Sequence, residues 1–180
     1  MDRVAARYHP VLVALHWLLA VLIVFAWGMG ALWLEEMPNA SAEKVRALRV
    51  HMVTGAAILA LTVLRLVVRL VTRKPPRAST GHAALDRAAV LAHYGLYALV
   101  ILMAGSGFAT ALSAGLPEIV FGGSGKPLPE SFAAYPARAV HGIVGSLLAL
   151  LILAHVAAAL WHHFVRRDGL LRRMSFRRPS

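Results

Sequence analysis

Cysteine is absent from the 180 residues of this chain, and acidic residues are scarce, with 8 Asp and Glu against 19 Lys and Arg. The lack of cysteine excludes a small secreted domain held together by disulfides. Charged residues make up only 15% of the chain, whereas hydrophobic residues make up 59% and the mean hydropathy is +0.66. This composition excludes a disordered basic tail, a collagen-like chain and an ordinary water-soluble domain, and it indicates a membrane protein.

Four stretches of the sequence are long and apolar enough to cross a membrane, which takes about 20 residues. They cover residues 10–34, 50–71, 88–113 and 139–165, and only the second contains charged residues, Arg65 and Arg69. Both arginines come late in their stretch, where long side chains can reach an interface. We therefore expect an all-α membrane protein with a single domain over residues 1–180, folded as an up-down-up-down four-helix transmembrane bundle. The first stretch is too long for a cleaved signal peptide and is expected to be a mature helix.

The distribution of charge predicts the orientation of the bundle. Together with Arg65 and Arg69 at the end of the second stretch, the N-terminus, the connection after that stretch and the C-terminal tail hold 14 Lys and Arg and 3 acids, whereas the other two connections hold 5 of each. By the positive-inside rule both termini are cytoplasmic. Anionic lipid headgroups account for the basic residues, so no nucleic acid is expected as a partner. The outer connection from Ala114 to Arg138 is rich in Gly and Pro and is expected to lack regular structure.

Nine histidines are many for a chain of this size, and several lie at membrane depth, where polar groups are costly. His141 and His155 are 14 residues apart, so they lie on one helix face about 21 Å apart. Depth in the predicted bundle pairs His16 with His155 near the inner side, and His51 with His141 near the outer side. Two facing histidines at each of two levels can hold a metal centre, and bis-imidazole ligation suits haem iron.

Two glycines accompany the outer pair, since Gly55 and Gly145 each lie four residues after a histidine, on the same helix face. They would let a porphyrin approach the backbone, although close helix packing is an equally good explanation. A haem-free transporter of zinc or copper is the alternative to haem. Zinc sites usually combine histidine with cysteine or carboxylate. The chain has no cysteine, and its four apolar stretches contain no Asp or Glu.

The chain resembles the bacterial cytochrome b561 family. The resemblance is carried by Leu15-His16-Trp17, by His51 with Gly55, by the spacing of His141 and His155, and by the segment from His155 to His163, HVAAALWHH. It extends over nearly the whole chain, including the ending Leu170-Leu171-Arg172-Arg173-Met174.

The resemblance implies a protein of the bacterial inner membrane whose four helices carry two haem b groups. It implies that His16 with His155 and His51 with His141 are the axial ligands. It also implies a reaction with ubiquinone and, for one branch of the family, oxidation of superoxide on the periplasmic side. Other members are electron-relay subunits of larger dehydrogenases or hydrogenases. The short connections here favour the stand-alone superoxide oxidase branch.

Further residues could serve this reaction. The outer cations that could attract superoxide are Lys44, Arg46, Arg49, Lys126 and Arg138, although pairing with headgroups or haem propionates explains Arg49 and Arg138 equally well. Near the inner end, His93, His162 and His163 could surround a haem or quinone and relay protons. For His163 the favoured interpretation is an interfacial residue in an aromatic and basic belt beside Trp161 and Arg166.

Overall fold

The structure, a computed structural model, describes residues 7–76 and 79–176, and all regular structure within these ranges is helical. Four helices are long and apolar enough to span a membrane, as the sequence predicts: Pro10–Leu34, Ala42–Val71, Ala83–Ser113 and Pro136–Arg166. The first consists of α1 (Pro10–Gly28) and a wider π-helical end, η1 (Met29–Leu34). The second and third are α2 (Ala42–Val71) and α3 (Ala83–Ser113). The fourth combines α5 (Pro136–Trp161) with a second π-helical end, η3 (His162–Arg166).

Three of the helices begin earlier than the apolar stretches predict. The start of α2 is residue 42 rather than 50, because Ser41 caps the helix by accepting a hydrogen bond from the Lys44 N–H at 3.2 Å. The start of α3 is residue 83 rather than 88, and α5 begins with Pro136 in its first turn. An apolar window marks only the hydrocarbon-facing part of a helix. The 30 residues of α2 extend over about 45 Å, which is longer than that part.

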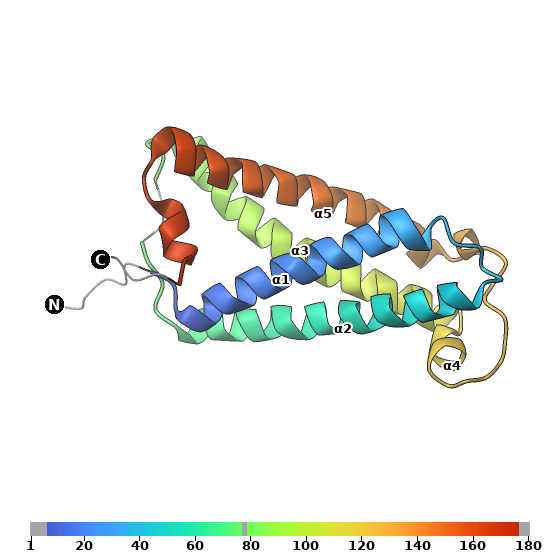
Figure 1. Ribbon diagram of the computed structural model, residues 1–180. Helices are drawn as coiled ribbons and strands as arrows, with labels where there is room; N and C mark the ends of the chain where they lie inside the picture. Colours follow the sequence, from blue (N-terminus) through green and yellow to red (C-terminus); the bar gives the residue numbers. More distant parts are fainter. Residues whose placement is uncertain (1–6, 77–78, 177–180) are drawn as a thin grey trace.

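The bundle consists of two antiparallel helix pairs (Figure 1). Most of the packing lies within the pairs, between α1 and α2 and between α3 and α5, and a smaller contact between α2 and α3 joins them. In the described residues, α5 makes almost no close backbone contact with α1 or α2. A central apolar cluster crosses the two pairs and includes Leu19, Ile58, Val100 and Leu148. The outward surface is strongly apolar as well, with Val21 66% and Leu70 78% exposed, as expected of a protein that faces lipid.

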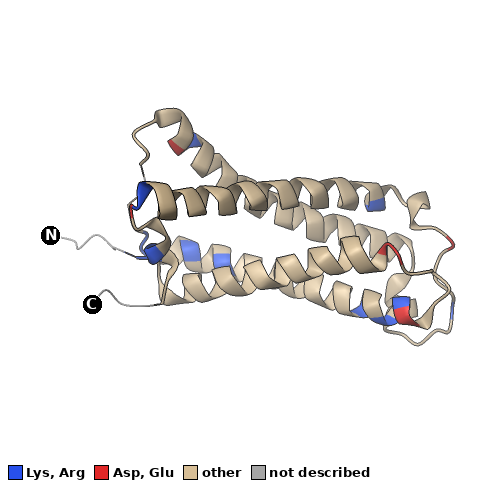
Figure 2. Ribbon diagram, turned by 45° about the horizontal axis from the view of Figure 1, so that its top comes forward, with Lys and Arg blue, Asp and Glu red and all other residues tan. Residues whose placement is uncertain are grey.

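The two ends of the bundle differ in charge (Figure 2). What we call the basic end consists of residues 7–10, 71–76, 79–83 and 162–176. Both ends of the described chain lie together there, since the Tyr8 N–H donates to the Arg173 carbonyl at 3.4 Å. The opposite end, which we call the loop end, consists of residues 35–41 and 114–135 and carries charges of both signs. Assignment of the basic end to the cytoplasm remains a prediction from charge.

The expectation that residues 114–138 lack regular structure is wrong in part: residues 121–131 contain no helix or strand, as predicted, but helical elements lie on both sides of them. The segment contains a short helix, α4 (Leu116–Val120), and a 3-10 turn, η2 (Phe132–Ala134). Gly115 adopts φ +66°, which turns the chain from α3 into α4. Leu116 and Val120 of α4 are buried against Leu34 and Leu48. Leu128, from the Gly- and Pro-rich part of the segment, is buried in the same apolar cluster.

Candidate haem centres

The loop-end pair, His51 of α2 and His141 of α5, brings two imidazole rings together between helices that otherwise barely touch. Their ring centres are 6.2 Å apart and the ring planes are inclined by 76°. His141 Nδ1 lies 3.0 Å from the Met103 carbonyl oxygen and 3.2 Å from the Ser106 hydroxyl. Because a carbonyl only accepts hydrogen bonds, Nδ1 carries the proton, and the Nε2 lone pair is left available to a metal ion.

His51 differs from His141 in that its Nδ1 atom is buried without a hydrogen-bond partner among the described residues. Its ring faces the π-helical segment η1, where a Cβ added at Gly30 would lie 3.3 Å from His51 Cε1. Gly107 of α3 is even closer to the other ring, since a Cβ there would lie 3.1 Å from His141 Cε1. Both imidazoles therefore lie against glycine backbone.

The basic-end pair consists of His16 of α1 and His155 of α5, again with ring centres 6.2 Å apart and with an inclination of 71°. His93 of α3 extends the group, because its ring centre lies 5.3 Å from that of His155. His93 Nδ1 is 2.6 Å from the Ala89 carbonyl and therefore carries a proton. The predicted depths of the histidines in the bundle pair His16 with His155. The structure brings these two rings together, with His93 beside them.

The spacing within both pairs fits one metal ion between the rings. A metal ion binds an imidazole nitrogen at about 2.0–2.1 Å, and the ring centre lies about 1.1 Å behind that nitrogen, so two opposed imidazoles have centres about 6.2–6.4 Å apart. No group of three or more His, Cys, Asp or Glu side chains that could hold a metal occurs within the ranges the structure describes. Two protein ligands are too few for a structural zinc site, but they suffice for haem iron, whose other four ligands come from the porphyrin.

The two glycines singled out in the sequence have different surroundings. A Cβ added at Gly55 would meet nothing within 4 Å, so the helix face one turn after His51 is open. Gly145 is buried against α3, where a Cβ would lie 3.1 Å from the Met103 methyl group. Gly145 thus serves close helix packing. The sequence analysis missed Gly30 and Gly107, although the Gly105-Ser106-Gly107 run in the third span was a visible signal of close approach.

The five outer cations have partners of two kinds. Three of them lie beside carboxylates. Arg138 is 2.5 Å from Glu35, Lys126 is 3.0 Å from Glu118 and Arg46 is 3.8 Å from Glu43. In contrast, Lys44 Nζ donates to the Met37 carbonyl at 2.7 Å, and Arg49 Nε donates to the Val120 carbonyl at 2.9 Å. A carbonyl does not cancel a full charge, so Lys44 and Arg49 are the two of these five cations that no carboxylate offsets within salt-bridge distance in the described residues.

The C-terminal strap, residues 162–176, folds across the basic end from α5 to α1 (Figure 1). His162 is buried, and its Nδ1 lies 2.5 Å from the Asp168 carboxylate. The strap ends in the 3-10 helix η4 (Leu170–Met174), where the Met174 carbonyl accepts a 2.9 Å hydrogen bond from Trp17 Nε1. His163 is exposed and stacks edge-on with Phe164, a position that fits an interfacial residue.

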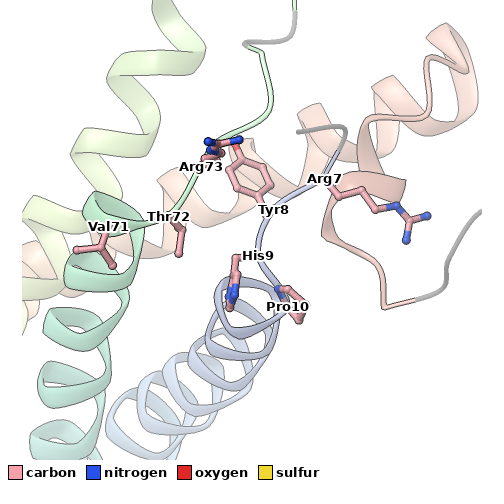
Figure 3. Close-up of a pocket in the computed structure, with 7 residues that line it drawn as sticks. All are labelled: Arg7, Tyr8, His9, Pro10, Val71, Thr72 and Arg73. Atoms are coloured by element: carbon pink, nitrogen blue, oxygen red, sulfur yellow. The ribbon is translucent and has the colours of Figure 1, made fainter. Parts of the chain in front are cut away.

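A surface pocket of about 490 Å³ lies at the same end (Figure 3). Residues from the start of α1 and the end of α2 line it: Arg7, Tyr8, His9, Pro10, Val71, Thr72 and Arg73. None of the histidines of the two pairs contributes to this pocket. The candidate haem centres are therefore defined by side-chain pairing between helices rather than by this surface pocket.

Comparison with known proteins identifies relatives along nearly the whole chain. The family described as prokaryotic cytochrome b561 matches residues 7–177. Cytochrome b561 homolog 2 of Escherichia coli K12 is 28% identical over 172 residues, which cover 93% of this chain and 90% of that protein. Cytochrome b562 of Cereibacter sphaeroides is 30% identical over 171 residues, covering 93% and 94%. A probable superoxide oxidase of Yersinia pestis is 26% identical over 175 residues, covering 93% and 95%.

Proposed function

Because the chain belongs to the prokaryotic cytochrome b561 family, a family of haem b proteins that transfer electrons in bacterial inner membranes, we propose that it is a di-haem oxidoreductase. In this proposal electrons enter at the loop end and leave to ubiquinone at the basic end. The observation that carries the proposal is the presence of two histidine pairs at different depths, each with ring centres 6.2 Å apart. The proposed donor is superoxide, supported by the similarity to a probable superoxide oxidase.

His51 with His141, and His16 with His155, would hold one haem b each. When bound, the haems would supply one-electron transfer. The Met103 carbonyl holds His141 in the tautomer that offers Nε2, as the outer hydrogen bonds of metal-binding histidines commonly do. Since His141 and His155 lie on one helix, the two histidine pairs are about 21 Å apart along α5.

At the loop end, the charges of Arg49 and Lys44 would attract a small anion toward the outer pair. Arg49 is two residues before His51, and its guanidinium lies 5.8 Å from the centre of the Phe121 ring. Local positive potential raises the association rate of an anionic substrate without a deep pocket.

At the basic end, reduction of ubiquinone to ubiquinol takes two electrons and two protons. Two superoxide anions would therefore supply one turnover and leave as two molecules of oxygen. In this proposal His93, which lies beside His155, and His162, which pairs with Asp168, would deliver the protons.

The first test is the haem content of the purified chain in detergent. We expect a dithionite-reduced minus oxidised spectrum of b-type haem and two haems per chain by the pyridine haemochrome assay. His141→Ala and His155→Ala should each reduce the content to about one, whereas His163→Ala, a change at an exposed histidine, should leave two. A chain that binds no haem when haem is abundant would overturn the proposal.

The second test is the reaction itself. Stopped-flow mixing of the haem-loaded chain with superoxide and a soluble ubiquinone should give quinol at one equivalent for every two superoxide anions consumed. A chain with two haems that does not react with superoxide would instead be an electron-relay subunit of a larger dehydrogenase, the alternative that the sequence leaves open.

A further inference from the structure

Arg65 of α2 is partly buried, and its side chain is bound to α1. Its Nη1 donates a hydrogen bond of 2.5 Å to the carbonyl of Leu12 on α1, and Leu12 is only 1% exposed. Leu12 is one helical turn before His16, so the guanidinium is held about 6 Å along α1 from the basic-end pair. It interacts electrostatically with both His16 and His155. The sequence predicts only that the side chain of Arg65 can reach an interface, and its hydrogen bond to the third residue of α1 was not predicted.

The charge of Arg65 is not cancelled by an acid. Within the described part of the chain, no carboxylate lies within salt-bridge distance of its guanidinium. The two acids described at this end have other partners, because Asp86 accepts hydrogen bonds from Ser79 and Thr80, and Asp168 pairs with His162. At the loop end, Arg138 precedes His141 by one turn and is neutralised by Glu35, whereas Arg49, two residues before His51, lacks a carboxylate partner but is exposed, so water screens its charge better than that of the partly buried Arg65. The surroundings of the two pairs are therefore electrostatically unequal.

A fixed positive charge favours the state of a nearby redox centre that carries more electrons. This effect is strong where water is excluded, because the effective dielectric constant is low. Burial and nearby charge are among the means by which a protein sets the potential of haem.

We propose that Arg65 raises the reduction potential of the haem held by His16 and His155, and thereby favours electron flow from the loop end to the basic end. The proposal rests on the di-haem function proposed above. The Leu12 carbonyl orients the guanidinium without neutralising it, and Arg65 acts as a positioning and tuning residue that needs no contact with a substrate.

Potentiometric titration of the purified, haem-loaded protein tests this inference, with haem content measured on every sample. In Arg65→Gln, we expect one of the two midpoint potentials to move to a more negative value, beyond the reproducibility of the titration, while the other stays as in the wild type. Arg65→Lys keeps the charge and should keep both midpoints. Arg69→Gln removes the same charge one turn nearer the end of α2, where water screens it better, and should cause a clearly smaller change.

Several outcomes would overturn the inference. Arg65→Gln with two haems and both midpoints unchanged would do so, as would a shift in Arg65→Lys as large as that in Arg65→Gln, or an equal shift in Arg69→Gln. If Arg65→Gln loses a haem, Arg65→Lys decides: unchanged midpoints support the role of charge, and a lowered midpoint contradicts it. A wild-type chain without haem would overturn the proposed function instead, so the two failures are distinguishable.

Discussion

At the scale of single residues, the candidate centres depend on glycine, which has no side chain, as well as on histidine. Gly107 allows α3 to approach the His141 ring so closely that the Met103 carbonyl and the Ser106 hydroxyl reach Nδ1. The neighbouring Gly105 has no such role, since a Cβ there would meet nothing within 4 Å. The two positions therefore form a matched pair for testing the importance of this close approach.

Gly107→Ala should weaken haem binding at the loop-end pair. The new methyl group would lie 3.1 Å from His141 Cε1, so the ring must move and its hydrogen bond to Met103 must lengthen. Loss of such an outer contact typically costs about 10- to 100-fold in metal affinity. We expect faster transfer of one haem per chain to a haem scavenger such as apomyoglobin, and no change in Gly105→Ala. Equal transfer rates in the two variants would contradict this account of His141.

Arg49→Gln should slow the reaction with superoxide at low ionic strength. Arg49 is bound to a neutral carbonyl, so it contributes a full charge near His51, whereas the charge of Lys126 is offset by Glu118. We expect the second-order rate constant, measured by stopped flow, to fall by about threefold or more in Arg49→Gln and to change less in Lys126→Gln. The difference between Arg49→Gln and the wild type should shrink as salt is added. A difference that persists at high salt would indicate a structural effect on α4 instead.

At the scale of helices, the sequence predicts the four spans well because a hydrocarbon core requires long apolar runs. It predicts their ends less well, since Ser41 and Pro136 begin helices outside the apolar windows. The depth of each histidine follows from its position in a span, which is why the pairs could be predicted. The strap could not be predicted, because it depends on contacts between distant residues, such as Trp17 with Met174. The position of Arg65 escaped prediction for the same reason.

The strap contains an acid whose ionisation should control its attachment. Burial alone would raise the pKa of Asp168, but hydrogen bonds from His162 and from the Leu170 N–H, together with the charges of His162 and Arg166, hold it below its usual value. A carboxylate with a lowered pKa stabilises the folded state above its unfolded pKa of about 3.9, and this contribution is lost as the pH falls through the lower folded value.

Asp168→Asn should therefore loosen the strap at neutral pH. Hydrogen–deuterium exchange, expressed as protection factors to remove the intrinsic pH dependence, should show lower protection of residues 162–174 in this variant. In the wild type, the same protection should hold from pH 7 to about pH 4 and decline only below it. Glu118→Gln, which removes an exposed acid at the loop end, serves as the control and should leave the strap protected. Unchanged protection in Asp168→Asn would show that the Trp17 and Arg173 contacts alone hold the strap.

At the scale of the whole molecule, the two histidine pairs join parts of the bundle that the polypeptide itself joins only weakly. The α1–α2 pair contacts the α3–α5 pair mainly through α2 and α3. In the described residues α5 has almost no close backbone contact with α1 or α2, yet each proposed ligand pair connects α5 to one of them. Haem would therefore act as a structural bridge as well as an electron carrier.

Removal of haem should consequently lower the stability of the whole bundle. A ligand present at about 1,000 times its Kd stabilises the folded state by about 4 kcal/mol. For a chain of this length that corresponds to a change in Tm on the order of 10 °C for each site. We expect His16→Ala and His51→Ala each to lower the Tm in detergent and the double variant to lower it further, whereas His163→Ala should leave it unchanged. A double variant that lacks haem but unfolds at the wild-type temperature would mean that the α2–α3 contact suffices to hold the two pairs together.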